Sequence, residues 1–166
     1  MAIRSEADTA LAKAQAADPT LTALINDSSG YAVFPSVGKG GFGLGGAYGQ
    51  GILYERGLFA GYCDMTQATI GFQLGAQTYT EIIVFATQEA VDQFKTGNFA
   101  FDAQATAVAL KSGAAANAKY AAGVAVFTMD QTGLMYEATV GGQKFTFKPL
   151  AADTAAAKPE ADKPKD

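Results

Sequence analysis

The sequence predicts an α+β fold: a curved antiparallel β-sheet, or a partly closed barrel or sandwich, packed by N-terminal helices and by a short helix near residues 88–95. Three observations carry this prediction. Residues 3–25 space their apolar side chains as an amphipathic helix does. From residue 42 onward, bulky and small residues alternate with the period of a strand. The later apolar runs are separated by Gly-containing turns, which is typical of antiparallel hairpins.

The N-terminal segment reads as two helices with a break between them. Asp18 can cap the second helix, and Pro19 suits its first turn. A turn cluster at residues 26–30 follows. We expect the first helix to dock on the sheet and not on a membrane, because its apolar face is mostly Ala and its polar face is not basic. Five residues share the helical spacing: Ile3, Ala7, Ala10, Leu11 and Ala14.

The strands begin with residues 31–34, a short apolar run that we expect Pro35 to stop. In the next run, the odd positions from 41 to 51 hold only Gly or Ala, so one face of this strand is nearly bare. The bulky residues of the run fall on even positions: Phe42, Leu44, Tyr48, Ile52 and Tyr54. Residues 55–57 are predicted to form a three-residue hairpin loop with Gly57 at positive φ, and residues 58–86 to form two more strands.

The C-terminal half contains a predicted helix over residues 87–97, with Thr87 as its cap and Gly97 at its end. Residues 98–122 give no clear pattern. Two hairpins are predicted after them, one around residues 131–133 and one around Gly141 and Gly142. The expected organisation is an N-terminal helical segment over 1–27, a core over 28–150 that forms one domain with it, and a disordered tail over 151–166.

Composition excludes several kinds of chemistry. The chain has no histidine, and Cys63 is its one cysteine, so Ser-His-Asp and Cys-His catalysis and Cys/His zinc sites are excluded. Nothing in the spacing of the carboxylates singles out a catalytic pair. The net charge of −4 argues against bulk nucleic-acid binding, which needs basic surface. We therefore expect no enzyme activity, cofactor, metal or nucleic-acid partner.

The glycine-rich stretch at residues 38–51 contains two G-x-G-x-x-G patterns, and Asp64 follows at the distance a dinucleotide site would require. That fingerprint needs a strand before it and a helix after it, whereas strand-like alternation runs straight through these glycines. No Gly-Lys-Ser/Thr sequence supports a Walker loop either. We therefore expect no nucleotide. The bare face indicates either close packing within a curved sheet or a wall for a lipid chain.

The same stretch supplies the candidate lipid-binding residues. Lys39, with free backbone amides at Gly40 and Gly41, could meet a lipid phosphate, although a solvated turn is the simpler interpretation. Phe42 and Tyr48, on the bulky face, are candidates for acyl or interfacial contact.

Three further basic residues lie elsewhere in the predicted fold. Arg56 lies at the opposite end of the same strand, too far away to share a headgroup with Lys39. Lys111 and Lys119 could form a second cluster or lie in a solvated loop.

Three segments resemble conserved blocks of the SYLF-domain family, known also as an actin-binding domain from its yeast members. Residues 30–55 resemble the family's signature, and residues 70–99 and 132–142 resemble its second and closing blocks. The resemblance covers nearly everything from about residue 20 to residue 148. It implies binding of phospholipids, including phosphoinositides, and actin regulation in eukaryotes. Bacterial members resemble secreted or lipid-anchored envelope proteins.

The function expected from these observations is that of a non-enzymatic phospholipid-binding module, the soluble part of a bacterial envelope protein or lipoprotein. The alternative is a protein-interaction module, with actin or an envelope protein as its partner. The expected location is the periplasm or outer membrane, as a processed or lipid-anchored protein whose signal is not in this chain, or else outside the cell. Within the sequence, no apolar run is long enough to span a bilayer.

Overall fold

The computed structural model describes residues 2–39, 47–67, 78–97, 99, 106–130, 138–139 and 143–149. These residues form three helices and eight strands. The helices are α1 (Ala2–Ala17), α2 (Thr20–Asp27) and α3 (Gln88–Lys95). The strands are β1 (Gly30–Lys39), β2 (Ala47–Glu55), β3 (Leu58–Gln67), β4 (Tyr79–Phe85), β5 (Thr106–Ala109), β6 (Val124–Asp130), β7 (Ala138–Thr139) and β8 (Gln143–Pro149).

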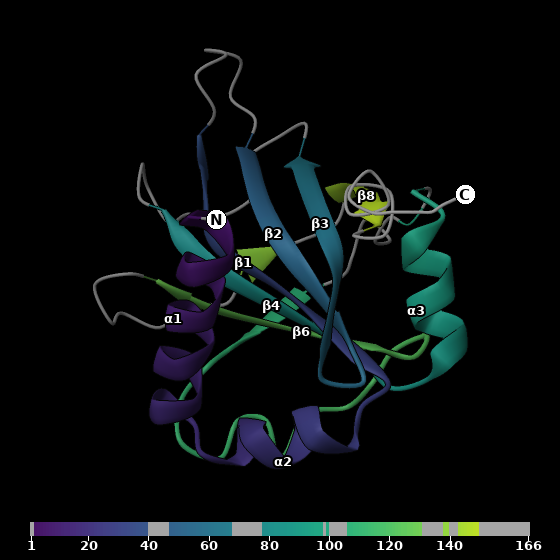
Figure 1. The fold of residues 1–166 in the computed structure, drawn as a ribbon. Helices are drawn as coiled ribbons and strands as arrows, with labels where there is room; N and C mark the ends of the chain where they lie inside the picture. The colour runs from purple at the N-terminus through teal and green to yellow at the C-terminus, as the bar shows by residue number, and fades with distance from the viewer. Residues whose placement is uncertain are drawn as a thin grey trace.

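The strands form one sheet in the order β7-β5-β6-β4-β1-β2-β3-β8 (Figure 1). Neighbouring strands are antiparallel except β5 and β6, which are parallel. Among the described residues β7 and β8 are the two edges, so the sheet is not closed into a barrel. The predicted α+β class with a curved sheet is confirmed, with one parallel pair added to the antiparallel scheme.

Two hydrophobic layers pack on the two faces of this sheet. We call the side covered by α1 and α2 the α1 face, and the side covered by α3 the α3 face (Figure 1). Strand β4 is buried along its whole length because both of its faces are covered. Large buried residues of the α1 face are Leu21, Ile52, Ile82 and Phe127, and those of the α3 face are Phe34, Leu53, Met65, Ile83, Phe85, Phe94 and Phe145.

The sheet is strongly curved, with the α3 face on the inside. Strands β4 and β8 are four places apart in the strand order, a distance of about 19 Å in a flat sheet. Yet Gln143 of β8 hydrogen-bonds directly to Glu81 of β4 across this face. The rings of Phe34 on β1 and Phe145 on β8 lie 5.7 Å apart. The concave face is therefore narrow, and side chains fill it.

The bare face of the glycine-rich strand is occupied by side chains of β1. A Cβ atom added at Gly51 would lie 2.5 Å from the carbonyl oxygen of Val33 and 2.6 Å from the ring of Phe34. One added at Gly49 would lie 2.8 Å from Val37 Cγ2. For residues 47–51, which are extended as predicted, close packing within the sheet explains the glycines. Residues 40–46 lie outside the described residues.

Pro35 does not end the first strand, contrary to the prediction. Strand β1 continues to Lys39 through a register shift between Val33 and Ser36, where an extra residue opposes β2. Proline is tolerated at such a bulge because no ladder hydrogen bond is needed from its nitrogen. The Thr80 hydroxyl donates a hydrogen bond of 2.9 Å to the Pro35 carbonyl oxygen and stabilises the bulge.

Three predicted hairpin connections differ in the structure. Glu55 pairs with Leu58, so the β2–β3 loop has two residues, Arg56 and Gly57, both at positive φ. Strand β7 pairs with β5 and does not pair with β6. Strand β8 pairs with β3 and not with β7. Local turn signals missed the pairings of β7 and β8 because their partner strands lie far away in the sequence.

The helix termini lie close to the predicted ones, but the N-cap residue of α2 is Pro19 and not Asp18. The break between α1 and α2 falls at Asp18 and Pro19, and the Asp18 carboxylate accepts hydrogen bonds from the backbone N–H and the hydroxyl of Thr20. The Thr87 hydroxyl accepts from the Ala90 N–H and caps α3. In the segment left open at residues 98–122, the described part contains β5 and a series of turns over 112–117.

Candidate functional site

The predicted lipid-binding residues cluster at one end of the sheet. At this end, which is the upper one in Figure 1, β1 and β3 finish and β2, β4 and β8 begin. Lys39 is the last residue of β1 and its backbone pairs with Ala47. Gly40, Gly41 and Phe42 lie outside the described residues. Tyr48 is thus the one candidate whose side chain is described.

Tyr48 lies half-buried on the α1 face of β2. Its hydroxyl donates a hydrogen bond of 3.1 Å to Asp64 Oδ1 on β3. Burial, followed by the hydrogen bond to the Asp64 carboxylate, raises the pKa of the Tyr48 hydroxyl, so it stays neutral. Beside Tyr48 is a surface pocket of about 170 Å³, which is also lined by Ile3 and Glu6 of α1. The ring therefore has one apolar flank and one polar end, as interfacial tyrosines do.

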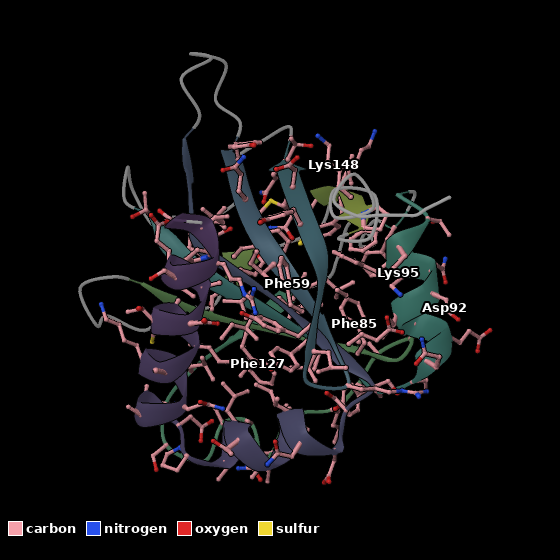
Figure 2. All side chains as sticks on the ribbon, viewed as in Figure 1. Phe59, Phe85, Asp92, Lys95, Phe127 and Lys148 are labelled. Atoms are coloured by element: carbon pink, nitrogen blue, oxygen red, sulfur yellow. The ribbon has the colours of Figure 1, made fainter. Side chains whose placement is uncertain are left out.

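A basic surface adjoins Tyr48 on the same side of the sheet. We call it the β3–β8 surface: Tyr62, Asp64, Thr66, Lys144, Thr146 and Lys148. The two lysines and both threonines are exposed. In the register, Lys144 opposes Thr66, one residue from the upper end, and Lys148 opposes Tyr62. A pocket of about 250 Å³ joins Lys148 to Tyr62, Asp64 and Ile3, and Figure 2 labels Lys148 at the periphery of the molecule.

The sequence analysis did not single out Lys144 and Lys148. The signal was present, because "QKFTFK" at residues 143–148 alternates polar and aromatic residues as a half-buried strand does. Phe145 is buried and Phe147 partly buried on the α3 face, which leaves both lysines on the opposite, exposed side.

The other basic residues are not brought to this surface. Arg56 lies in the β2–β3 turn at the opposite end of β2 from Tyr48, as predicted, and donates a hydrogen bond of 3.1 Å to Gln88. Lys111 and Lys119 are exposed, on either side of the turns that Asp18 holds against α2. Lys95, which Figure 2 labels on α3, forms an ion pair with Glu55.

A polar cluster lies inside the concave α3 face, near the same upper end. We call it the Glu81 cluster: Glu81, Gln143, Gln67 and Tyr79. Gln143 Nε2 donates to Glu81 Oε1 at 3.0 Å and to Gln67 Oε1 at 3.1 Å. Burial raises the pKa of Glu81 to about 7, and hydrogen bonds from Gln143 and Tyr79 offset only part of this effect.

Three features of the described residues concern reactivity, metal binding and membrane crossing. Cys63 is buried, and burial raises the pKa of its thiol well above the usual range, so the thiol is unreactive. Within the described ranges, no group of three or more Cys, Asp and Glu side chains could hold a metal ion. In the same ranges, no helix combines the length and apolar character needed to cross a bilayer.

Comparisons with known proteins agree with this description. Residues 66–153 match the family described as "Ysc84: Las17-binding protein actin regulator". The chain is similar to "Beta cell expansion factor A" of Aeromonas veronii, with 31% identity over 147 residues. The match covers 87% of this chain but 56% of the relative, so the chain spans little more than half of that protein's length. The chain belongs to the Ysc84 (SYLF) family, and this membership indicates a non-enzymatic module of the lipid-binding or protein-interaction kind.

Proposed function

We propose that this chain binds anionic phospholipid surfaces through the β3–β8 surface and the adjoining Tyr48, as the soluble part of a bacterial envelope protein. The observation that carries the proposal is the shared position of Tyr48, Lys144 and Lys148 on one side of the sheet. Exposed lysines attract anionic headgroups, at about 1 kcal/mol for each cation near the surface. Tyrosines on the same side supply the amphipathic rings that favour an interface.

The upper end of the sheet adds to this surface. Lys39 ends β1 there, one strand away from Tyr48, and the glycine-rich connection of residues 40–46 leaves from the same place. Successive backbone N–H groups in such a connection can bind phosphate oxygens. Lys144 begins β8 at this end too. We therefore propose Lys144 as the headgroup contact on β8 and Lys39, with Gly40 and Gly41, as a second contact on β1, which β2 and β3 separate from β8.

The acidic groups of this region limit the strength of the interaction. Asp64 lies within the β3–β8 surface and Glu6 lines the pocket beside Tyr48. With a net charge of −4 for the chain, binding depends on the local pattern of charge and not on the whole protein. We therefore propose weak binding that salt screens strongly.

Vesicle flotation tests the proposal. The full chain is mixed at low ionic strength with vesicles of phosphatidylcholine alone, or with phosphatidylglycerol added. We expect it to float only with the anionic vesicles. The Lys144→Glu/Lys148→Glu variant should bind at least about tenfold more weakly, because two attractions become repulsions. Lys39→Glu should weaken binding by a smaller factor.

The matched control is Lys111→Glu/Lys119→Glu, which changes the net charge equally on exposed sites outside the β3–β8 surface. It should bind almost as the unmodified chain does. Equal losses in both double variants would mean that net charge alone matters, and the named surface would be wrong. If the unmodified chain does not float with anionic vesicles, the lipid proposal is contradicted altogether.

The second candidate function is protein interaction, favoured by the family description "Las17-binding protein actin regulator". Co-sedimentation with actin filaments tests it directly. Filament binding that survives the Lys144→Glu/Lys148→Glu change, together with no vesicle binding, would favour this second function over the first.

A further inference from the structure

The Glu81 cluster lies where the curvature of the sheet brings distant strands together. Glu81 belongs to β4, Gln143 to β8 and Gln67 to β3. Strands β1, β2 and β3 separate β4 from β8 in the sheet order. The hydrogen bond from Gln143 to Glu81 therefore connects the edge strand β8 to the middle of the sheet across the concave face.

Two acceptor atoms of the cluster are buried without a donor, although the Tyr79 hydroxyl lies beside Glu81. Gln143 Nε2 is shared between Glu81 Oε1 and Gln67 Oε1. Among the described residues, Glu81 Oε2 and Gln143 Oε1 have no hydrogen-bond partner, although both are buried. A buried acceptor without a donor destabilises the folded state. Glu81 Oε2 thus lacks a donor.

A proton on Glu81 would supply that donor. A protonated carboxyl group carries an O–H donor and no charge, whereas the ionised form is an acceptor with a charge in an apolar surrounding. The groups packed around Glu81 are Tyr79 of β4, Gln143 of β8 and its two partners in the register, Phe34 of β1 and Thr128 of β6. No described cation contributes to its titration. Lys144 and Lys148 of β8 lie on the opposite, exposed side of the sheet, so no described cation compensates an ionised Glu81.

We propose that the Glu81 cluster is a proton-dependent latch, which holds β8 across the concave face when Glu81 is protonated and releases the Gln143 end of β8 when Glu81 ionises. The raised pKa of about 7 sets the direction and the range of pH. The latch is closed on the acidic side and loosens as the pH rises from about 4.5 to about 7, above which Glu81 is ionised in the closed and the open form alike. The inference does not depend on lipid binding, because it concerns only the attachment of β8.

The first measurement follows the side-chain carboxyl carbon of Glu81 by NMR while the pH of the unmodified chain is varied. We expect Glu81 to titrate near pH 7, far above the ordinary glutamate value of 4.5. A midpoint near the ordinary value of 4.5 would overturn the latch. This measurement needs no variant, so a folding defect cannot leave the question open.

The second measurement is amide hydrogen exchange of β8, expressed as protection relative to an unfolded peptide at each pH. We take the pKa of Glu81 as about 7 when β8 is closed and 4.5 when it is open. The equilibrium constant for the opening that exposes Glu81 should then increase about 30-fold between pH 5.5 and pH 8.5. In Glu81→Gln, which carries a permanent amide donor, the protection of β8 should not change over this range.

Glu6→Gln is the matched control, since it makes the same chemical change on an exposed turn of α1. It should keep the pH dependence of the unmodified chain. The same pH dependence in Glu81→Gln as in the unmodified chain would overturn the latch. Equal loosening of β6 and β8 would also overturn it, because the whole sheet would then be opening.

Discussion

Two buried carboxyl groups, one on each face of the sheet, respond to burial in opposite ways. Asp18 lies between α1 and α2 on the α1 face and Glu81 inside the α3 face, and both are 0% exposed. Burial raises the pKa of each, but hydrogen bonds from Thr20, Ala115 and Gly113 outweigh it at Asp18, so the pKa of Asp18 is lowered. At Glu81 burial prevails and the pKa is raised.

The difference between these acids is the number of donors that reach them. Asp18 accepts from the backbone N–H groups of Thr20, Gly113 and Ala115 and from the Thr20 hydroxyl. These donors cannot leave without unfolding α2 or the 111–118 segment. Glu81 shares one amide donor with Gln67 and lies against Tyr79. Asp18 is therefore a permanent structural anion, whereas Glu81 can change its charge under ordinary conditions.

The largest expected effect is that of Asp18→Ala. This change leaves the buried N–H of Ala115 and three further donors without their acceptor and removes the anchor between α2 and the 111–118 segment. We expect the free energy of unfolding to fall by about 4 kcal/mol in urea titrations. Asp27→Ala, at an exposed site in the last turn of α2, should change it by less than about 0.5 kcal/mol. Similar losses in both variants would contradict the anchoring role.

The next effect is the pH dependence of stability. The pKa of Glu81 is higher in the folded state than in the unfolded state. Its contribution to the free energy of unfolding is therefore fully present below about pH 4.5 and is lost as the pH rises to about 7. The loss amounts to about 3 kcal/mol. Asp18 acts in the opposite direction, because its lowered pKa gives stability that disappears as the pH falls through its folded value.

Urea titrations at pH 4.5, 6 and 8 measure the free energy of unfolding and so test whether the two acids affect it in opposite directions. Glu81→Gln should remove most of the loss above pH 4.5. Asp18→Asn should instead remove stability that the unmodified chain has at pH 6 and 8. If Glu81→Gln loses as much stability between pH 4.5 and 8 as the unmodified chain, the contrast between the two acids is wrong.

A smaller effect tests the close packing of the α3 face. Gly51→Ala places a methyl group 2.5 Å from a backbone oxygen of β1, and backbone cannot move aside easily. We expect a loss of about 2 kcal/mol in the free energy of unfolding. Gln50→Ala, on the adjacent and exposed position of β2, is the control and should have little effect. A stable Gly51→Ala variant would show that the glycine serves some other purpose.

The smallest effect belongs to the Lys95–Glu55 ion pair, which joins α3 to β2. Its side chains are 31% and 22% exposed, so solvent screens the attraction. Hydrogen bonding to Lys95 lowers the pKa of Glu55. Lys95→Met should cost about 0.5 kcal/mol at low salt, and the difference from the unmodified chain should vanish at high salt. A cost that high salt leaves unchanged would mean that the lysine stem, and not its charge, stabilises α3.

Much of the fold followed from local patterns. The break at Asp18, the cap at Thr87 and the alternation around Tyr48 each depend on residues within one turn or one strand. These features can be predicted from the sequence, because a helix cap or the alternation of a strand depends only on residues that are close together in the chain. The predictions failed at Pro35 and at β7 and β8, where pairing with a distant strand decided the outcome.

The residues of the candidate site also separate into those that local sequence predicts and those that only strand pairing reveals. Tyr48 could be named from its position on the bulky face of a strand. Lys144 and Lys148 could not be assigned to the same surface, because only the antiparallel pairing of β8 with β3 brings them there. Lys39 was predicted in the turn that enters the glycine-rich strand, but it is instead the last residue of β1, while its proposed contact with a lipid phosphate remains a prediction.

By itself, the sequence determined the absence of histidine chemistry, the α+β class, the helix breaks and the alternation of the strands, since these depend on composition and on neighbours. Only the tertiary structure decided that β8 returns to β3 and that Gln143 meets Glu81 across the concave face. The curvature of the sheet accumulates from strand to strand across the five strands from β4 to β8, so no local sequence pattern predicts it. The charge of Glu81 depends on that curvature, because burial and not sequence sets its pKa.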